Sequence, residues 1–341
     1  MSTCTSTSTT PGPKALSTPQ DLAELIRRHD TFLFDCDGVI WSGPAGDVLT
    51  PHIIPTLHYL HSLQKRCCFV TNNATRSRQD YHSKFHHLGL VEVQLDDIFT
   101  CGSATASYIK EVVLPEIRGR GGKENIYLIG QESMEQELRG EGLEWTGGSD
   151  PEDDVLLADQ DFSSITPNPE IGMVVYSFQM RINYKQLAKA FNYLGSNPGY
   201  QLIMTNDDHS MKAQGGGILP GEGAIASVLY GARQDLKPLI VGKPYKPLLD
   251  VVRRTLNYDP EKTIFVGDRL ETDVLFGRRG GLTTLLVWTG FSKPSQLTSL
   301  TADELPHYTT GSVGELLKAK EVFDVVGHDG QTHDSVPEMK N

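Results

Sequence analysis

The stretch that decides the fold is Thr31–Trp41, with the sequence Thr-Phe-Leu-Phe-Asp-Cys-Asp-Gly-Val-Ile-Trp. Its first four residues form an apolar run that is typical of a strand buried on both faces of a parallel sheet. Two carboxylates, Asp35 and Asp37, follow this run directly, and Gly38 then lets the backbone turn sharply or approach a ligand closely. Ligands of parallel sheets gather beyond the carboxyl ends of the strands. The pattern therefore places Asp35 and Asp37 where chemistry is expected, and two neighbouring buried carboxylates require a cation or a shared proton.

The composition limits the classes of function that need to be considered. The chain has 341 residues, which is more than a single core usually takes. No apolar stretch approaches the roughly 18 residues that span a bilayer. A net charge of −12 disfavours nucleic acids and anionic membranes as partners, and an anionic substrate must be attracted by local positive charge. Five cysteines without disulfide or metal-ligand spacing favour a reduced, cytoplasmic setting.

Apolar strands alternate with amphipathic helices along most of the chain, which predicts an α/β fold with a doubly wound, mostly parallel, Rossmann-like sheet. This rhythm breaks at a segment rich in Gly and Arg, residues 118–123. We therefore expect a discontinuous core made of residues 20–117 and 238–326, with an inserted α/β domain at residues 118–237. The polar ends of the chain, residues 1–19 and 327–341, are predicted to be disordered tails.

Four predicted strands end in polar residues that can share one rim of the sheet. In chain order these are Asp35-x-Asp37, Thr71-Asn72-Asn73, Lys243 and Gly267-Asp268. Taken alone, Thr71 is also a common helix-start residue, Lys243 a common surface lysine and Asp268 a common turn residue. Their joint occurrence at successive strand ends favours a functional site.

Such a rim suits magnesium-assisted phosphoryl transfer. Asp35, Asp37 and Asp268 are the expected metal ligands, because carboxylates and a backbone carbonyl are the hard oxygen donors that Mg²⁺ prefers. Asp35 can attack phosphorus, while Asp37 can protonate the leaving alkoxide and later deprotonate the attacking water.

The remaining polar residues of the rim have supporting roles in this hypothesis. The Thr71 hydroxyl and the amides of Asn72 and Asn73 are expected to hold phosphate oxygens. Lys243 is expected to supply positive charge against the transferring group. We expect Asp273 to support the site or to start a helix rather than to bind the metal.

These residues resemble the motifs of the haloacid dehalogenase superfamily of aspartate-nucleophile phosphatases. Asp35–Val39 resembles its first motif, Thr71–Asn73 its second, Lys243 its third and Gly267–Asp273 its fourth. The longer first and fourth motifs look like the branch of 4-nitrophenylphosphatases and phosphoglycolate phosphatases, which is close to pyridoxal phosphatase. The resemblance covers about residues 21–290.

The resemblance implies a cap domain of the C2 type between the second and third motifs, Mg²⁺ as the cofactor and a small phosphorylated metabolite as the substrate. The expected substrates are like 2-phosphoglycolate, with 4-nitrophenyl phosphate as an artificial one. A substrate-selecting loop is expected after Thr205–Asp208, and its apolar Met211 favours phosphoglycolate, although the nearby His209 leaves pyridoxal 5′-phosphate open. Relatives in this branch pair through their caps, so a homodimer is expected.

Two alternative functions remain open from the sequence. One is a phosphatase that prefers pyridoxal 5′-phosphate. The other is a non-catalytic binding protein that has kept the same fold, which the intact acidic and basic motif residues argue against. Neither a nucleic acid nor a membrane is expected as a partner.

Overall fold

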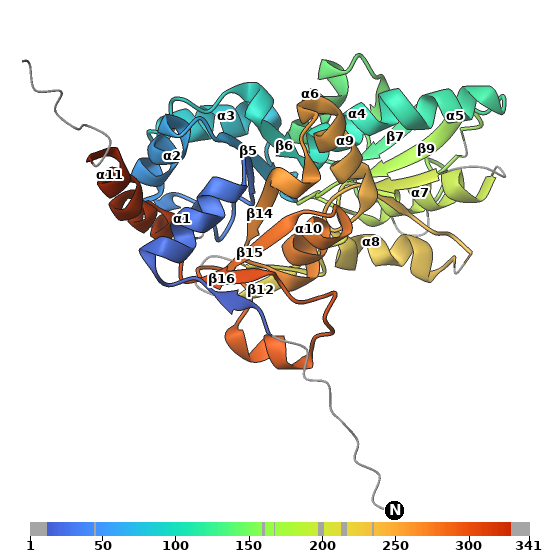
Figure 1. Ribbon diagram of the computed structural model, residues 1–341. Helices are drawn as coiled ribbons and strands as arrows, with labels where there is room; N and C mark the ends of the chain where they lie inside the picture. Colours follow the sequence, from blue (N-terminus) through green and yellow to red (C-terminus); the bar gives the residue numbers. More distant parts are fainter. Residues whose placement is uncertain are drawn as a thin grey trace, which may run out of the picture.

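The computed structural model describes residues 12–43, 46–158, 161–166, 168–196, 201–212, 217–233 and 235–328. In these residues the chain forms two parallel sheets and two short antiparallel hairpins, with helices packed on the sheet faces (Figure 1). The predicted α/β class with a Rossmann-like core sheet is confirmed.

The first sheet has the strand order β1-β16-β15-β14-β2-β5-β6. Its strands are β1 (Lys14–Ala15), β2 (Thr31–Phe34), β5 (Arg66–Thr71), β6 (Ile98–Thr100), β14 (Thr263–Gly267), β15 (Thr283–Val287) and β16 (Tyr308–Thr310). At the centre, Phe34 of β2 is in register with Val266 of β14 on one side and with Phe69 of β5 on the other. Three strands with polar residues at their carboxyl ends therefore finish side by side.

Strand β2 contributes to a hydrophobic layer on each face of this sheet. Phe32 and Phe34 face one layer, and Leu33 faces the other, because successive side chains of a strand point to opposite faces. The first layer is covered by α1 (Pro19–Arg28), α2 (Ile53–Ser62), α3 (Arg78–His87), the 3₁₀ segment Val313–Ala319 and α11 (Lys320–His328). Helices α1 and α11 lie side by side there (Figure 1).

The second sheet has the strand order β13-β10-β9-β7-β8. Its strands are β7 (Asn125–Ile129), β8 (Trp145–Gly147), β9 (Ile171–Tyr176), β10 (Gln201–Met204) and β13 (Leu239–Ile240). Helices α7 (Tyr184–Ser196) and α8 (Glu222–Gly231) pack on its outer face. A hairpin formed by β11 (Ser210–Lys212) and β12 (Ile218–Pro220) lies between β10 and α8 in the chain.

One layer of helices lies between the two sheets and packs against both. It contains α4 (Cys101–Tyr108), the π-helical turn Ile109–Val113, α5 (Leu114–Gly119), α6 (Glu132–Gly140), α9 (Lys246–Leu256) and α10 (Leu275–Arg279). A single hydrophobic cluster joins Leu33 and Phe265 of the first sheet to Met173 and Ile203 of the second. The inserted sheet therefore shares its inner core with the first sheet.

The sequence prediction is wrong for the strand before Lys243. Strand β13 pairs with β10 of the second sheet, although we expected it to return to the first. Residues 239 and 240 thus still belong to the inserted sheet, and the predicted return to the core at residue 238 comes too early. Lys243 reaches the rim of the first sheet from the edge of the second.

The predicted N-terminal tail is wrong at its end. Lys14 and Ala15 form the edge strand β1, which pairs with β16, and Leu16 is 3% exposed in the first hydrophobic layer. Thr18 then starts α1 by accepting a hydrogen bond from the Asp21 N–H. At the other end, α11 continues to His328, beyond the predicted boundary. The other parts of both predicted tails, residues 1–11 and 329–341, lie outside the described residues.

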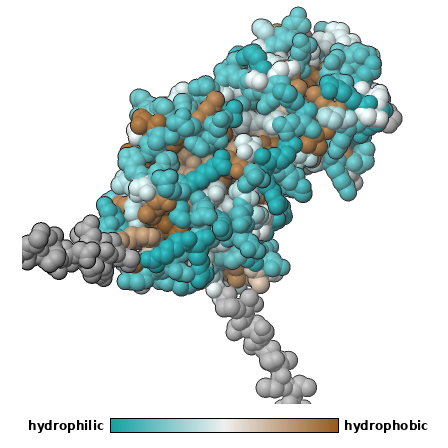
Figure 2. Space-filling view, turned by 45° about the horizontal axis from the view of Figure 1, so that its top comes forward, coloured by the Kyte–Doolittle hydropathy of each residue, from teal (hydrophilic) through white to brown (hydrophobic). Residues whose placement is uncertain are grey.

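The face shown in Figure 2 is mostly hydrophilic, with hydrophobic side chains in scattered groups. None of the helices among the described residues is long and apolar enough to cross a membrane.

Candidate active site

Two glycines leave room for the Asp268 carboxylate at the rim of the first sheet. Gly38 has a φ of 89°, and a Cβ atom built on it would lie 2.4 Å from Asp268 Oδ2. A Cβ atom on Gly290 would lie 1.6 Å from the same oxygen. The sequence motif places a glycine after Asp37 because the backbone must both turn and make room there.

Lys243 is held deep in the site by three oxygens. Its Nζ atom lies 2.7 Å from Asp35 Oδ1 and 2.8 Å from Asp273 Oδ1, and it donates to the Val70 carbonyl at 3.0 Å. The side chain is 2% exposed. Burial by itself lowers the pKa of this ammonium group, but the Asp273 and Asp35 carboxylates outweigh burial and hold the pKa above its ordinary value. Lys243 is therefore a fixed positive charge beside Asp35.

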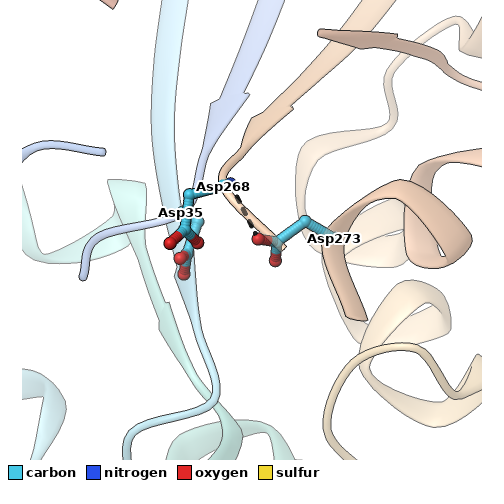
Figure 3. Close-up of side chains that lie close together, drawn as sticks. All are labelled: Asp35, Asp268 and Asp273. Atoms are coloured by element: carbon cyan, nitrogen blue, oxygen red, sulfur yellow. Dashed lines mark hydrogen bonds between the residues drawn. The ribbon is translucent and has the colours of Figure 1, made fainter. Parts of the chain in front are cut away.

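Three buried carboxylates converge at this point (Figure 3). Asp35, Asp268 and Asp273 each offer an oxygen within 4.8 Å of the others, and no other group of three or more potential metal-binding side chains occurs in the described part of the chain. Burial raises the pKa of Asp35 well above its usual range, against the opposing effect of Lys243. Burial and the charge of Asp273 raise the pKa of Asp268 to about 7.

The donor set at the rim fits a divalent cation. The Lys243 ammonium group pairs with two of the three carboxylates, Asp35 and Asp273, and a bound cation would favour the ionised forms of Asp35 and Asp268. Both oxygens of Asp273 already have partners: Oδ1 faces Lys243, and Oδ2 accepts hydrogen bonds from the backbone N–H groups of Asp268 and Arg269. Asp35 and Asp268 could therefore hold a metal ion, whereas Asp273 holds Lys243 and the Asp268 loop in place.

Asp37 reaches the solvent-accessible side of the rim. Its Oδ1 accepts a hydrogen bond from the Trp41 indole N–H at 2.8 Å, and its Oδ2 accepts one from the Asn73 side chain at 3.2 Å. These two donors fix the orientation of an exposed carboxyl group that can exchange protons with a substrate.

Thr71, the last residue of β5, and the two residues after it have different roles. The Thr71 hydroxyl accepts a hydrogen bond from the Asn73 N–H, and the Asn73 side chain binds Asp37 and Thr75. The Asn72 side chain is committed to Lys243: it donates to the Lys243 carbonyl at 2.9 Å and accepts from the Lys243 N–H at 2.7 Å. The Asn72 side-chain amide therefore positions the lysine, and binding of phosphate oxygens by the amides of Asn72 and Asn73 stays a prediction.

All the predicted site residues line one cavity of about 450 Å³, including Met211 of the β11–β12 hairpin. Sequence reasoning missed several other residues of its wall. These are Trp41, Arg76, Lys84, Phe178, Asn206, Asp208, Glu222, Arg269 and Phe291. The wall therefore joins both sheets and the hairpin.

Some of the missed residues carry a positive charge into the cavity wall. The Lys84 ammonium lies 3.7 Å from the centre of the Trp41 ring. The Arg269 guanidinium lies over the Phe291 ring, and one of its nitrogens is 3.8 Å from Asp208 Oδ1. The place of Arg269 directly after Asp268 in the fourth motif could have identified it from the sequence. Lys84 lies on α3, away from every motif in the sequence, and only the three-dimensional fold places it in the cavity wall.

Comparisons with known proteins agree with this geometry. A family model described as "Haloacid dehalogenase-like hydrolase" matches residues 32–144, and one described as "HAD-hyrolase-like" matches residues 240–316. A 4-nitrophenylphosphatase of Schizosaccharomyces pombe is 35% identical over 305 residues, which cover 89% of this chain and 98% of the relative. Phosphoglycolate phosphatase 2 of Arabidopsis thaliana is 34% identical over 313 residues, which cover 91% of this chain and 99% of the relative.

A solved structure shows the same similarity. The p-nitrophenyl phosphatase from Archaeoglobus fulgidus matches with a TM-score of 0.68 and 27% identity, covering 85% of this chain and 99% of that chain. The four motifs at one rim, the family models and the relatives lead to one assignment. The chain belongs to the haloacid dehalogenase-like hydrolases, in the branch of the 4-nitrophenylphosphatases and phosphoglycolate phosphatases, and is an enzyme of their phosphatase class.

Proposed function

We propose that this chain is a Mg²⁺-dependent phosphatase of small phosphomonoesters that works through an aspartyl-phosphate on Asp35. The observation that carries the proposal is the meeting of Asp35, Lys243 and Asp268 in one buried cluster, with Asp37 two residues from Asp35 at the exposed edge. The Asp35 and Asp268 carboxylates and the Asp37 backbone carbonyl would hold Mg²⁺. When bound, Mg²⁺ neutralises negative charge on the phosphate oxygens.

In the first step, a carboxylate oxygen of Asp35 bonds to phosphorus, and the bond from phosphorus to the leaving oxygen breaks. Asp37 gives its proton to that oxygen, so the alcohol leaves uncharged. Lys243 is already held 2.7 Å from Asp35 and offsets the negative charge on the transferring group without having to move.

In the second step, Asp37 takes a proton from a water molecule as the water oxygen bonds to phosphorus. The bond from phosphorus to Asp35 breaks, inorganic phosphate forms, and Asp35 returns as a carboxylate. Trp41 and Asn73 keep Asp37 in one orientation for both proton transfers.

The cavity supports a small substrate. Its volume of about 450 Å³ accommodates a metabolite, and residues of the second sheet and the β11–β12 hairpin form part of its wall. This wall covers part of the rim and restricts the size of the leaving group. We propose 2-phosphoglycolate-like compounds as substrates, because Met211 lines the cavity as an apolar residue.

Removal of the metal tests the proposed function directly. Purified protein is incubated with 4-nitrophenyl phosphate in Mg²⁺, in excess EDTA, and in EDTA followed by excess Mg²⁺. We expect hydrolysis in the first condition, loss of at least about 100-fold in the second and recovery in the third. Equal rates with and without EDTA would overturn the metal role, and no hydrolysis in Mg²⁺ would favour the non-catalytic alternative.

The alternative substrate, pyridoxal 5′-phosphate, is tested by comparing kcat/KM for the two compounds. We expect the wild type to prefer 2-phosphoglycolate and Met211→His to shift the ratio towards pyridoxal 5′-phosphate. A wild type that already prefers pyridoxal 5′-phosphate would reverse the assignment.

Pairing of two copies through the inserted domain and a cytoplasmic location also stay predictions. Size-exclusion chromatography with light scattering tests the pairing.

A further inference from the structure

The base of the β11–β12 hairpin is held by one buried carboxylate. The chain leaves β10 through Thr205 and Asn206, forms the hairpin, and returns at Gly221 and Glu222, the start of α8. A Cβ atom on Gly221 would lie 2.2 Å from the Asp208 carbonyl oxygen, so the two ends of the hairpin pack backbone against backbone. This close approach brings the Glu222 side chain against Thr205 and Asn206.

Glu222 is 3% exposed, and both of its carboxylate oxygens accept hydrogen bonds from the two residues that follow β10, Thr205 and Asn206. Its Oε1 accepts from the Thr205 hydroxyl at 2.6 Å and from the Asn206 N–H at 3.1 Å. Its Oε2 accepts from the Asn206 side chain at 2.9 Å. An acidic residue is common at the start of a helix, where its negative charge is favourable even when the side chain is exposed. This role does not explain why Glu222 is buried, because burial of a carboxylate costs free energy.

The hydrogen bonds continue from Glu222 to the catalytic lysine. The Asn206 side chain, held by Glu222, also donates to the Asn72 carbonyl at 3.0 Å. Asn72 in turn holds the Lys243 backbone on both its N–H and its carbonyl. Lys243 then contacts Asp35 at 2.7 Å. Every residue in this series of contacts is a buried polar residue, and each is hydrogen-bonded to the next.

We propose that Glu222 is a positioning residue of the active site. It fixes Asn206, and through Asn206 and Asn72 it fixes Lys243 against Asp35. The same contacts fasten the hairpin that carries Met211 over the cavity. The inference rests on the proposed phosphatase function and assigns to the inserted segment a part in placing the catalytic groups of the core.

Steady-state kinetics with 4-nitrophenyl phosphate in Mg²⁺ provides the first test. The assay is run at about pH 9, above the raised pKa of Glu222, where the wild-type side chain is a carboxylate. In Glu222→Gln the new amide group then meets the Asn206 amide donor to donor, so we expect kcat to fall about 10- to 100-fold while KM changes less than about 3-fold. Glu132→Gln is the matched control, because Glu132 is also the first residue of a helix and its side chain is 60% exposed. It should stay within about 2-fold of the wild type.

A double-mutant cycle shows whether Glu222 acts through Asn206. In an Asn206→Ala background, Glu222→Gln should change kcat less than about 2-fold, because the link is already broken. An undiminished loss in that background would overturn the proposal, as would an unchanged kcat in the single variant.

Amide hydrogen exchange gives a readout that does not depend on turnover. The Lys243 N–H donates to Asn72 Oδ1, so we expect it to exchange about 10-fold faster in Glu222→Gln, while the amides of β14 keep their rates. Unchanged protection at Lys243 would contradict the proposal even if activity fell. If the wild type hydrolyses no phosphomonoester, the proposed function fails, and the exchange data still decide whether Glu222 positions Lys243.

Discussion

The Lys243 side chain lies between two carboxylates that are themselves buried, Asp35 and Asp273. Lys243→Met keeps much of the side-chain volume but leaves both carboxylates without their cation. We expect the free energy of unfolding in EDTA to fall by about 3–5 kcal/mol, because an uncompensated buried charge is strongly destabilising. Urea unfolding measures this loss.

Lys246→Met is the control for the Lys243 variant. The Lys246 side chain is 79% exposed and pairs only with Asp250 of its own helix among the ion pairs of the described residues. Its loss should change the free energy of unfolding by less than about 1 kcal/mol. Similar losses in the two variants would mean that the buried cluster does not depend on Lys243.

Glu222 makes the stability of the folded protein depend on pH. Burial raises its pKa from 4.5 to about 8, whereas the unfolded chain keeps the ordinary value. Between these pH values the folded state holds a proton that the unfolded state has lost. The free energy of unfolding therefore falls as pH rises through this window, by about 1.4 kcal/mol per pH unit from this group.

Glu222→Gln removes this titration. We expect the difference in free energy of unfolding between the variant and the wild type to move in favour of the variant as pH rises from about 5 to about 8. Chemical unfolding of both proteins at several pH values, in excess Mg²⁺ to hold the metal ligands ionised, measures the difference. A difference that stays constant over this range would contradict the raised pKa.

The catalytic residues could be predicted from the sequence because each lies at or just beyond the end of an apolar strand. Asp35 and Asp268 directly follow β2 and β14, and Lys243 lies three residues after the end of β13, although this strand belongs to the other sheet. Glu222 and Asn206 could not be predicted. Asn206 matters because its side chain contacts Asn72, which lies 134 residues away in the chain. Glu222 acts on Asn72 only through Asn206, and an acidic residue at a helix start has an ordinary explanation.

At the scale of elements, the short edge strand β1 is held by the side chain that follows it. Leu16 is 3% exposed within the first hydrophobic layer, directly after the two residues that pair with β16. We expect Leu16→Ala to lower the free energy of unfolding by about 2–4 kcal/mol, because truncation of a buried leucine leaves a cavity. Chemical unfolding measures the loss.

Leu156→Ala is the matched control, since Leu156 is 76% exposed. It should change the free energy of unfolding by no more than about 0.5 kcal/mol. If Leu16→Ala were equally mild, residues 14–16 would not be part of the folded core.

The strands of five or six residues in both sheets were predictable because they are long enough to show a continuous apolar run, as in β9 and β14. Strand β1 has two residues and carries no such pattern, whereas the short apolar run at residues 239–241 indicates a strand without indicating which sheet it joins. The sheet that they join is decided by packing and by the paths of the preceding segments. Local sequence therefore predicted the existence of β13 but not its sheet, and it did not predict β1.

At the scale of the whole molecule, the active site depends on how two sheets share one layer of helices. The shared hydrophobic cluster holds the second sheet close enough for Lys243, at the end of β13, to reach Asp35 at the end of β2. It also holds the base of the β11–β12 hairpin against Asn72. The series of polar contacts from Glu222 through Asn206, Asn72 and Lys243 to Asp35 therefore links the second sheet to the first.

The central claim is that Asp35 is the group that bonds to phosphorus, and Asp35→Asn tests it most directly. The variant keeps the shape of the side chain, and circular dichroism checks that it folds. In Mg²⁺ with 4-nitrophenyl phosphate, we predict a loss of kcat of about 1,000-fold or more, while Asp303→Asn, at a fully exposed carboxylate, keeps wild-type activity. A folded Asp35→Asn protein with turnover within about 10-fold of the wild type would contradict the account.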